Sequence, residues 1–315
     1  MTESGLMHPK DFGRVAVLMG GDSAEREISL MSGQATLKSL SRSGVVADKV
    51  DMQGSDAIQK IVDGGYDRVL IMLHGRKGED GKVQAALELM DIPYTGSGVI
   101  ASALAMDKVL CKRVWQGFGI STPEFSVLDE TTDWQAVIDE LGTVFVKPAK
   151  EGSSIGISRA ATADELESAY RQASRYDSQV IAERFIQGAE YTVGILGEKI
   201  LPSVGMQAEG DFYDYQAKYF SDETLYSCPS DLDEQAEAEL GAMARQAYDV
   251  VGCSGWGRVD AMRDDSGRFW LLEVNTVPGM TDHSLVPKAA EEAGISFDDL
   301  VLQILSSSYK DRRGE

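Results

Sequence analysis

Residues 255–285 read G-W-G-R-V-D-A-M-R-D-D-S-G-R-F-W-L-L-E-V-N-T-V-P-G-M-T-D-H-S-L. Two segments rich in apolar and aromatic residues, Trp256–Met262 and Phe269–Val274, flank the turn-forming residues Asp264–Gly267. Apolar runs on either side of a short turn that ends in glycine predict a β-hairpin. The other motifs of the chain can be arranged around this hairpin.

Acidic and amide side chains fall at matching places on the two predicted strands. Asp260 lies on the first strand, and Glu273 and Asn275 lie two residues apart at the end of the second, hence on one face. Such an all-oxygen donor set suits Mg²⁺. Ordinary exposed acids would explain a lone D…E-x-N better. However, Arg258 shares the face of Asp260, and a Pro-Gly turn with exposed N–H groups follows at 276–281, so together they favour a metal–phosphate site.

The overall composition limits the class of protein. With 315 residues, 43% hydrophobic and 26% charged, the chain is predicted to form two or three globular domains. The 30 Lys and Arg against 51 Asp and Glu give a net charge of −21, which argues against a nucleic-acid partner. An anionic substrate therefore needs a local cluster of basic residues.

The cysteines and the hydropathy of the sequence indicate in which part of the cell the protein is located. The three cysteines, Cys111, Cys228 and Cys253, have no C-x-x-C spacing and predict neither disulfides nor a zinc site. We find neither a signal-peptide pattern nor an apolar run long enough for a membrane span. The sequence thus predicts a cytoplasmic protein with no membrane association.

Alternating strands and helices open the chain. A strand at Arg14–Met19, the turn G-G-D-S at 20–23 and a helix from Glu25 to Leu40 begin an α/β domain. A later strand, Val69–Leu73, ends in H-G-R-K-G-E-D-G at 74–81. Both polar, glycine-rich loops fall at the carboxyl ends of predicted parallel strands, where ligands bind. A simple turn explains each loop alone, and the G-G-D-S turn is not the dinucleotide-binding G-x-G-x-x-G.

The middle of the chain carries signals for phosphate binding. The apolar strand 143–148 holds Lys147 near its end, where a lysine needs an anionic partner. The small-residue loop E-G-S-S-I-G at 151–156 follows and offers backbone N–H groups to phosphate oxygens. Glu183 and Glu190 flank a short turn, and their carboxylates suit either ribose hydroxyls or solvent.

Long irregular stretches divide or interrupt the predicted domains. The Pro- and Gly-rich residues 92–98 predict a domain boundary ahead of a helix over 99–108, in which Lys108 by itself is an ordinary lysine. Residues 206–229 form a long stretch without a periodic pattern, which is typical of a functional lid or a disordered tract, and its many aromatic residues favour the lid.

Taken together, these motifs resemble a known family. K-P followed by E-G-S-S-I-G, then R-V-D and L-L-E-V-N-T-V-P-G-M-T, is similar to the ATP-grasp fold. The segments G-G-D-S-A-E-R-E-I-S-L, H-G-R-K-G-E-D-G, Y-T-G-S-G, M-D-K and Y-D-Y-Q-A-K-Y narrow the resemblance to the D-alanine–D-alanine ligases, over nearly the whole chain.

The resemblance implies an architecture. An ATP-grasp fold, α+β in its ATP-binding part, would follow a Rossmann-like α/β domain with a parallel sheet. The implied domains are 1–98 (first D-alanine), 99–187 (nucleotide phosphates) and 188–315 (metal site, lid at 206–229, second D-alanine). A homodimer is also implied.

The resemblance further implies a role for individual residues. The implied set is Lys108, Lys147 and Lys218 with the loop serines Ser153 and Ser154 on the ATP phosphates; Glu183 on adenine and Glu190 on ribose; Asp260, Glu273 and Asn275 on two Mg²⁺ ions, for which Mn²⁺ can substitute; Glu25, with a Ser153–Tyr219 network, and His74 beside the first D-alanine; Arg258 and the Gly279 N–H at the oxyanion; Ser284 and Leu285 at the second D-alanine.

The implied reaction is ATP-dependent formation of D-alanyl-D-alanine, through a D-alanyl phosphate, for peptidoglycan precursor synthesis. A ligase that joins D-alanine to D-lactate or another acceptor is the nearest alternative, and a tyrosine at Tyr219 favours the dipeptide. A nucleotide-binding regulator without catalysis is disfavoured because every implied ligand is present. A nicotinamide oxidoreductase is disfavoured by the missing G-x-G-x-x-G.

Overall fold

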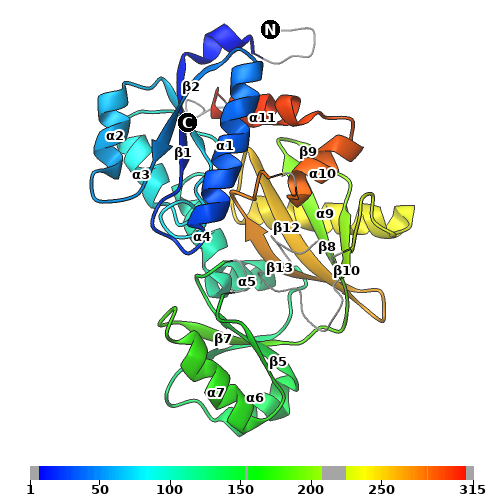
Figure 1. Cartoon of the computed structure of the whole chain (residues 1–315). Coiled ribbons are helices and arrows are strands. Elements are labelled where there is room, and N and C mark those ends of the chain that lie inside the picture. The colour runs from blue at the N-terminus through cyan, green and yellow to red at the C-terminus, as the bar shows by residue number, and fades with distance from the viewer. Residues whose placement is uncertain (1–6, 153–154, 208–224, 282, 310–315) are drawn as a thin grey trace.

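A computed structural model of the chain describes residues 7–152, 155–207, 225–281 and 283–309. Its strands form three separate sheets, one near each end of the long axis of the molecule and one between them (Figure 1). Among the described residues, no helix is both long and apolar enough to cross a membrane.

The first sheet is parallel and has the strand order β2-β1-β3. Apolar residues fill β1 and β3, as expected for strands covered on both faces. The elements of this unit are η1 (Pro9–Phe12), β1 (Arg14–Met19), α1 (Arg26–Arg42), β2 (Val46–Asp51), α2 (Ala57–Gly64), β3 (Arg68–Ile71) and α3 (Lys82–Leu89). The predicted N-terminal α/β unit with a parallel sheet is confirmed.

The second sheet is antiparallel, with the order β4-β7-β5-β6, and the helices α6 and α7 pack beside it (Figure 1). The elements are α4 (Val99–Met106), α5 (Lys108–Gly117), β4 (Phe125–Leu128), α6 (Trp134–Leu141), β5 (Val144–Pro148), β6 (Ser158–Ala160), α7 (Ala163–Ala173) and β7 (Val180–Arg184). Thr162 begins α7 with a capping box, in which Thr162 and Glu165 bond to each other's backbone N–H groups.

The third sheet is antiparallel, and β8 and β12 form its centre in the order β11-β10-β8-β12-β13, with β9 paired to β8. The helix α9 covers one face of it. The elements are β8 (Gly188–Leu196), β9 (Lys199–Ile200), β10 (Val204–Gln207), β11 (Leu225–Ser227), α9 (Glu234–Val250), β12 (Trp256–Asp264), β13 (Phe269–Asn275), α10 (Leu285–Glu292), α11 (Phe297–Ser306) and η2 (Ser307–Tyr309).

The end of the chain returns to its beginning. Helix α11 lies beside α1 (Figure 1), and Arg42 on α1 forms an ion pair with Asp298 on α11 at 2.5 Å. A hydrophobic core contains Val17 of the first sheet and Leu196 of the third sheet together with Ile304 of α11. The first and third sheets are therefore joined by packing, and the predicted three-part division at residues 98 and 187 stays a prediction.

The structure differs from the sequence prediction in two places that matter for the site. The helix expected over 99–108 is two helices, because the backbone of Asp107 is extended and its carboxylate caps α5 by accepting the N–H groups of Val109 and Leu110. The stretch 206–229, which was expected to be irregular, contains the end of β10 and the whole of β11, and these two strands pair in an antiparallel manner. Residues 208–224 of that stretch lie outside the described residues.

Candidate active site

Asp260 is the centre of a group of polar contacts on the third sheet. The antiparallel register of β12 and β13 sets Asp260 opposite Glu273 and Arg258 opposite Asn275, with a β-bulge after Asp260. Arg258 donates Nε and Nη2 to the two Asp260 oxygens at 2.8 and 2.7 Å. Asn275 Nδ2 donates to Asp260 at 3.0 Å, and the Thr192 hydroxyl of β8 donates at 2.5 Å. The predicted hairpin and the grouping of its polar residues are both present.

These residues fit a magnesium site of the kind that uses few protein ligands. Asp260, Glu273 and Asn275 supply two carboxylates and a carboxamide, and only oxygen donors face Mg²⁺ in such sites. No group of three or more His, Cys, Asp or Glu residues is arranged as a complete metal cage within the described ranges. A Mg²⁺ ion held by so few protein ligands would take its remaining coordination from water and phosphate oxygens.

Lys108 stands beside this group at the start of α5. Its ammonium is 3.3 Å from Glu273 Oε2 and donates to the carbonyl of Glu151 at 2.8 Å, in the loop predicted to hold phosphates. The backbone N–H of Lys108 also donates to Ala149 O, so both ends of the residue contact the 149–151 segment. The Asp107 cap explains why the helix starts here, and the contacts with Glu273 and the Glu151 carbonyl place the Lys108 ammonium at the site.

Lys147 and Glu183 meet on the second sheet, where β5 and β7 are neighbours. The Lys147 ammonium donates to Glu183 Oε1, and Lys112 of α5 forms an ion pair with Glu183 Oε2 at 2.6 Å. Lys112 is fully buried and also donates to the Thr122 hydroxyl at 2.5 Å. Burial raises the pKa of Glu183, but the two ammonium groups outweigh it and hold that pKa below its usual value. Glu183 is thus a buried carboxylate between two lysines.

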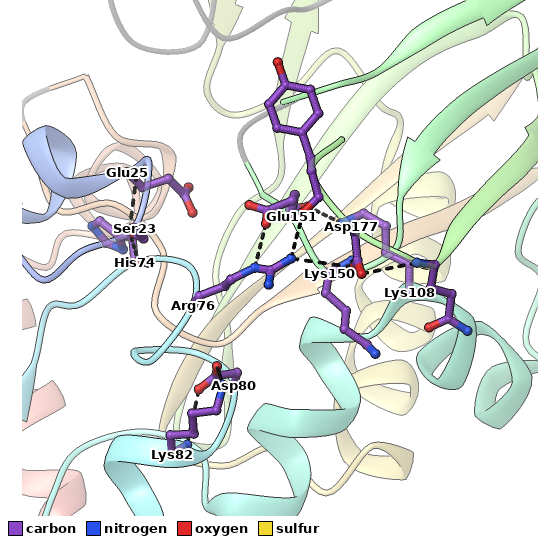
Figure 2. Close-up of polar contacts among 12 residues, drawn as sticks. Ser23, Glu25, His74, Arg76, Asp80, Lys82, Lys108, Lys150, Glu151 and Asp177 are labelled. Atoms are coloured by element: carbon purple, nitrogen blue, oxygen red, sulfur yellow. Dashed lines mark hydrogen bonds and ion pairs between the residues drawn. The ribbon is translucent and has the colours of Figure 1, made fainter. Parts of the chain in front are cut away.

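Glu25 lies where the N-terminal domain meets the phosphate loop (Figure 2). Its carboxylate is so close to Gly152 that a Cβ added there would lie 3.0 Å from Glu25 Oε2. The Ser23 hydroxyl accepts the Glu25 N–H at 3.3 Å and donates to the His74 carbonyl at 2.8 Å. Residues from both glycine-rich loops of the N-terminal domain therefore converge on the segment that precedes Ser153.

Arg76 of the 74–81 loop also contacts the phosphate loop, which is the loop at 151–156 predicted to bind phosphates (Figure 2). Its Nε donates to Glu151 at 2.6 Å, and its Nη2 donates to the Tyr176 carbonyl at 3.1 Å. Asp177 in turn accepts the Lys150 N–H at 2.9 Å. The 74–81 loop is thereby fixed to the base of the phosphate loop.

The segment 276–281 contains Gly279, whose N–H is predicted to bind an oxyanion, and is called the oxyanion loop below; residues of the N-terminal part of the chain hold it in place. The Val277 N–H donates to Glu79 Oε1 at 3.0 Å, and Glu79 Oε2 accepts the Gly75 N–H at 2.8 Å. Burial and the neighbouring Glu25 carboxylate raise the pKa of Glu79. His74 is buried, and its two ring nitrogens contact Val277 O and the Ser32 hydroxyl.

Ser284 and Leu285 follow the oxyanion loop at the start of α10. The Ser284 hydroxyl accepts the Thr281 N–H at 2.9 Å, and a Cβ added to Gly279 would lie 2.8 Å from it. Leu285 is buried in the core shared with the first sheet. Gly279, predicted for the oxyanion, and Ser284, predicted for the second D-alanine, are therefore neighbours.

Glu190 lies on β8 beside an open cavity of about 190 Å³ at the edge of the third sheet. The cavity is also lined by Met206 and Tyr226 from β10 and β11. The proposed contact of Glu190 with a ribose stays a prediction. Four other predicted residues, Ser153, Ser154, Lys218 and Tyr219, lie outside the described residues.

Sequence reasoning missed Ser32, Arg76, Glu79 and Lys112. Lys112 carried a usable signal, because it occupies the same buried face of α5 as Val109 and Trp115, where a lysine needs an anionic partner. Glu79 belongs to the loop that was predicted to bind a ligand, but its contact with Val277 lies 198 residues away in sequence. Only the fold brings these partners together.

Comparison with known proteins decides the family. The model of the D-Ala–D-Ala ligase C-terminus matches residues 114–306, and the model of the N-terminus matches residues 44–97. A D-alanine–D-alanine ligase of Saccharophagus degradans is 56% identical over 297 residues, which are 94% of this chain and 94% of that protein. The chain belongs to the D-alanine–D-alanine ligase family.

Solved structures of the ligase family show the same fold. A D-alanine–D-alanine ligase of Bacillus anthracis, complexed with ATP, matches with a TM-score of 0.81 at 33% identity, over 94% of this chain and 97% of that one. The VanG D-Ala:D-Ser ligase of Enterococcus faecalis matches with a TM-score of 0.81 at 28% identity, over 94% and 99%. The ATP-grasp fold expected from the motifs is confirmed.

The buried Lys112 gives a prediction about stability. Lys112→Met removes one of the two cations that contact Glu183, so we expect the free energy of unfolding to fall by about 3 kcal/mol in urea titrations, as for other broken buried ion pairs. The double variant Lys112→Met/Glu183→Gln should recover part of the loss. Lys38→Met, at an exposed position of α1, is the control and should change stability by less than about 0.5 kcal/mol. A Lys112→Met protein as stable as the wild type would contradict the role given to this ion pair.

Proposed function

We propose that this chain is an ATP-dependent ligase that joins two molecules of D-alanine and releases ADP and phosphate. The observation that carries the proposal is the group around Asp260, where an oxygen donor set, an arginine and the nearby Lys108 adjoin the oxyanion loop. Relatives that are more than half identical over nearly the whole chain are named D-alanine–D-alanine ligases, which supports D-alanine as the substrate.

In the first step, a carboxylate oxygen of the first D-alanine attacks the γ-phosphorus of ATP. The new O–P bond forms as the bond from that phosphorus to the bridging oxygen of ADP breaks, which gives a D-alanyl phosphate. Lys108 and Lys147 bind the phosphates and orient them for in-line transfer. A Mg²⁺ or Mn²⁺ ion would be held by Asp260, Glu273 and Asn275. When bound, it would neutralise part of the phosphate charge.

In the second step, the amino group of the second D-alanine attacks the acyl carbon of the D-alanyl phosphate. The carbonyl oxygen becomes an oxyanion, which Arg258 and the Gly279 N–H stabilise. The tetrahedral species then expels phosphate, and the proton that the nitrogen loses is balanced on the released phosphate. Glu25 pairs with the ammonium of the first D-alanine, while Ser284 and Leu285 position the carboxylate of the second. Glu183 and Glu190 contact adenine and ribose. Roles for His74, Ser153, Ser154, Lys218 and Tyr219 follow from the family resemblance.

We place the reaction in the cytoplasm, where ATP is available, as a step in making a peptidoglycan precursor. The expected homodimer belongs to the same proposal. Acceptors other than D-alanine, such as D-lactate or D-serine, are outcomes that the assay below distinguishes.

The proposal is tested by ADP release with Mg²⁺ and ATP, followed by mass analysis of the product. D-alanine alone should stimulate ADP release and yield the dipeptide, whereas L-alanine should not. A product formed only when D-lactate or D-serine accompanies D-alanine would show that this added compound, and not a second D-alanine, is the acceptor. No stimulation by any of these mixtures would refute the proposed ligase activity.

Arg258 provides the mutational test of the oxyanion role. Arg258→Ala should lower kcat by about 10²–10³, because it removes a donor that acts on the charge of the tetrahedral species. Arg268→Ala, which removes an exposed arginine stacked on Trp270 in the same hairpin, is the control and should keep wild-type turnover. Near-wild-type kcat in Arg258→Ala would sink the assignment.

A further inference from the structure

The oxyanion loop is held at both ends of its Pro278–Gly279 turn by two buried side chains of the N-terminal domain. At one end, His74 Nδ1 lies 2.8 Å from the carbonyl oxygen of Val277. At the other end, the Met280 N–H donates to Ser32 Oγ at 3.0 Å. Ser32 Oγ and His74 Nε2 are themselves 3.1 Å apart, so the two anchors form one continuous chain of hydrogen bonds.

The direction of every hydrogen bond in this chain follows from its ends. A carbonyl oxygen only accepts, so His74 Nδ1 carries the proton that is donated to Val277. In a neutral imidazole Nε2 is then the acceptor, and it takes the proton of the Ser32 hydroxyl. The Ser32 oxygen keeps its lone pairs for the Met280 N–H. Each donor thus meets an acceptor when His74 is neutral and in its Nδ1–H form.

Burial keeps the histidine in this form. Ser32 and Met280 are fully buried and His74 is 5% exposed, so a charged imidazole would lack solvation. Burial, with a smaller effect of the Arg258 charge, lowers the pKa of His74 to about 4, although the bond to Val277 acts in the opposite sense. The imidazole is therefore neutral across the pH range in which a cytoplasmic enzyme works.

We propose that Ser32 and neutral His74 are positioning residues that set the Gly279 N–H for the oxyanion, an assignment that rests on the proposed ligase function. Neither side chain has to touch a reacting atom for this role. They fix the backbone on either side of Gly279, and the backbone carries the donor. His74 is accordingly assigned to the oxyanion loop as well as to the first D-alanine.

The position of Ser32 on α1 gives this arrangement a consequence. Helix α1 begins directly after Glu25, and Ser32 lies two turns further on, on the same side of the helix. The first turn of α1 therefore adjoins the proposed ammonium site of the first D-alanine. Through Ser32, the same helix holds the loop whose Gly279 N–H would donate to the carbonyl oxygen of that D-alanine. Correct placement of the two substrate groups relative to each other becomes a property of one rigid element.

The first test is Ser32→Ala, compared with Thr36→Val as a matched control. Thr36 is one turn further along α1 and equally buried, and its hydroxyl has no hydrogen-bond partner within the described part of the chain. Ser32→Ala should lower kcat about tenfold while the KM for ATP changes less than about twofold, because only the tetrahedral step uses the oxyanion loop. A tetrahedral phosphinate analogue of the dipeptide should lose affinity by the same factor as kcat/KM. Thr36→Val should match the wild type in all three quantities.

The outcomes separate this inference from the proposed function. An inactive wild type refutes the ligase proposal itself. An active wild type with unchanged kcat and unchanged analogue affinity in Ser32→Ala overturns the positioning role alone. Equal losses in Ser32→Ala and Thr36→Val would also overturn it, since they would reflect general disturbance of α1.

A second measurement is made first on the wild type, so that its main result does not depend on whether a variant folds. The chain has three histidines, so ¹⁵N-histidine labelling gives three sets of imidazole signals. One set should show a neutral Nδ1–H ring that keeps this form from pH 8 to pH 5, and it should shift in Ser32→Ala but not in Thr36→Val. Three rings that all titrate near the ordinary pKa of about 6.5 would contradict the hydrogen-bond chain.

Discussion

The bidentate contact between Arg258 and the buried Asp260 is the interaction on which the rest of the site depends. Asp260 is 3% exposed, and a carboxylate at that depth is stable only with charge and hydrogen bonds around it. Arg258 supplies the charge, while Thr192 and Asn275 supply further donors from the neighbouring strands. Because these contacts require three strands in register, the order β8-β12-β13 and the proposed chemistry are fixed together.

Pairing of opposite charges lets a strongly acidic protein present cations to an anionic nucleotide. The net charge is −21, yet Lys108, Lys147 and Arg258 each contact an acid of the site, namely Glu273, Glu183 and Asp260. Each ammonium or guanidinium is thereby held in place for its proposed partner, which is ATP phosphate for the two lysines and the oxyanion for Arg258. Under the proposed function, the contact with anions depends on these locally placed cations rather than on the overall charge.

Local sequence patterns allowed most of the helices and strands to be predicted. Contacts between residues far apart in sequence could not be predicted in this way. The D-D-S-G turn between apolar runs was enough to place the hairpin and to bring Asp260, Glu273 and Asn275 together. The break at Asp107 was missed because a single capping residue was treated as part of a helix, and β10 and β11 were missed because each is short and finds its partner across residues 208–224. Ser32, Glu79 and Lys112 have partners far away in sequence, and their roles appear only when the first and third sheets and α5 are packed together.

Binding of ATP in the presence of Mg²⁺ tests the central claim most directly, since the claim is that the Asp260 group is a metal–phosphate site. Calorimetric titration should be carried out on the wild type, Asp260→Asn and Asp265→Asn, the last being the same change at an exposed position in the turn of the same hairpin. We predict that Asp260→Asn weakens binding by about tenfold or more and that Asp265→Asn binds like the wild type. Equal affinity of all three proteins would contradict the account.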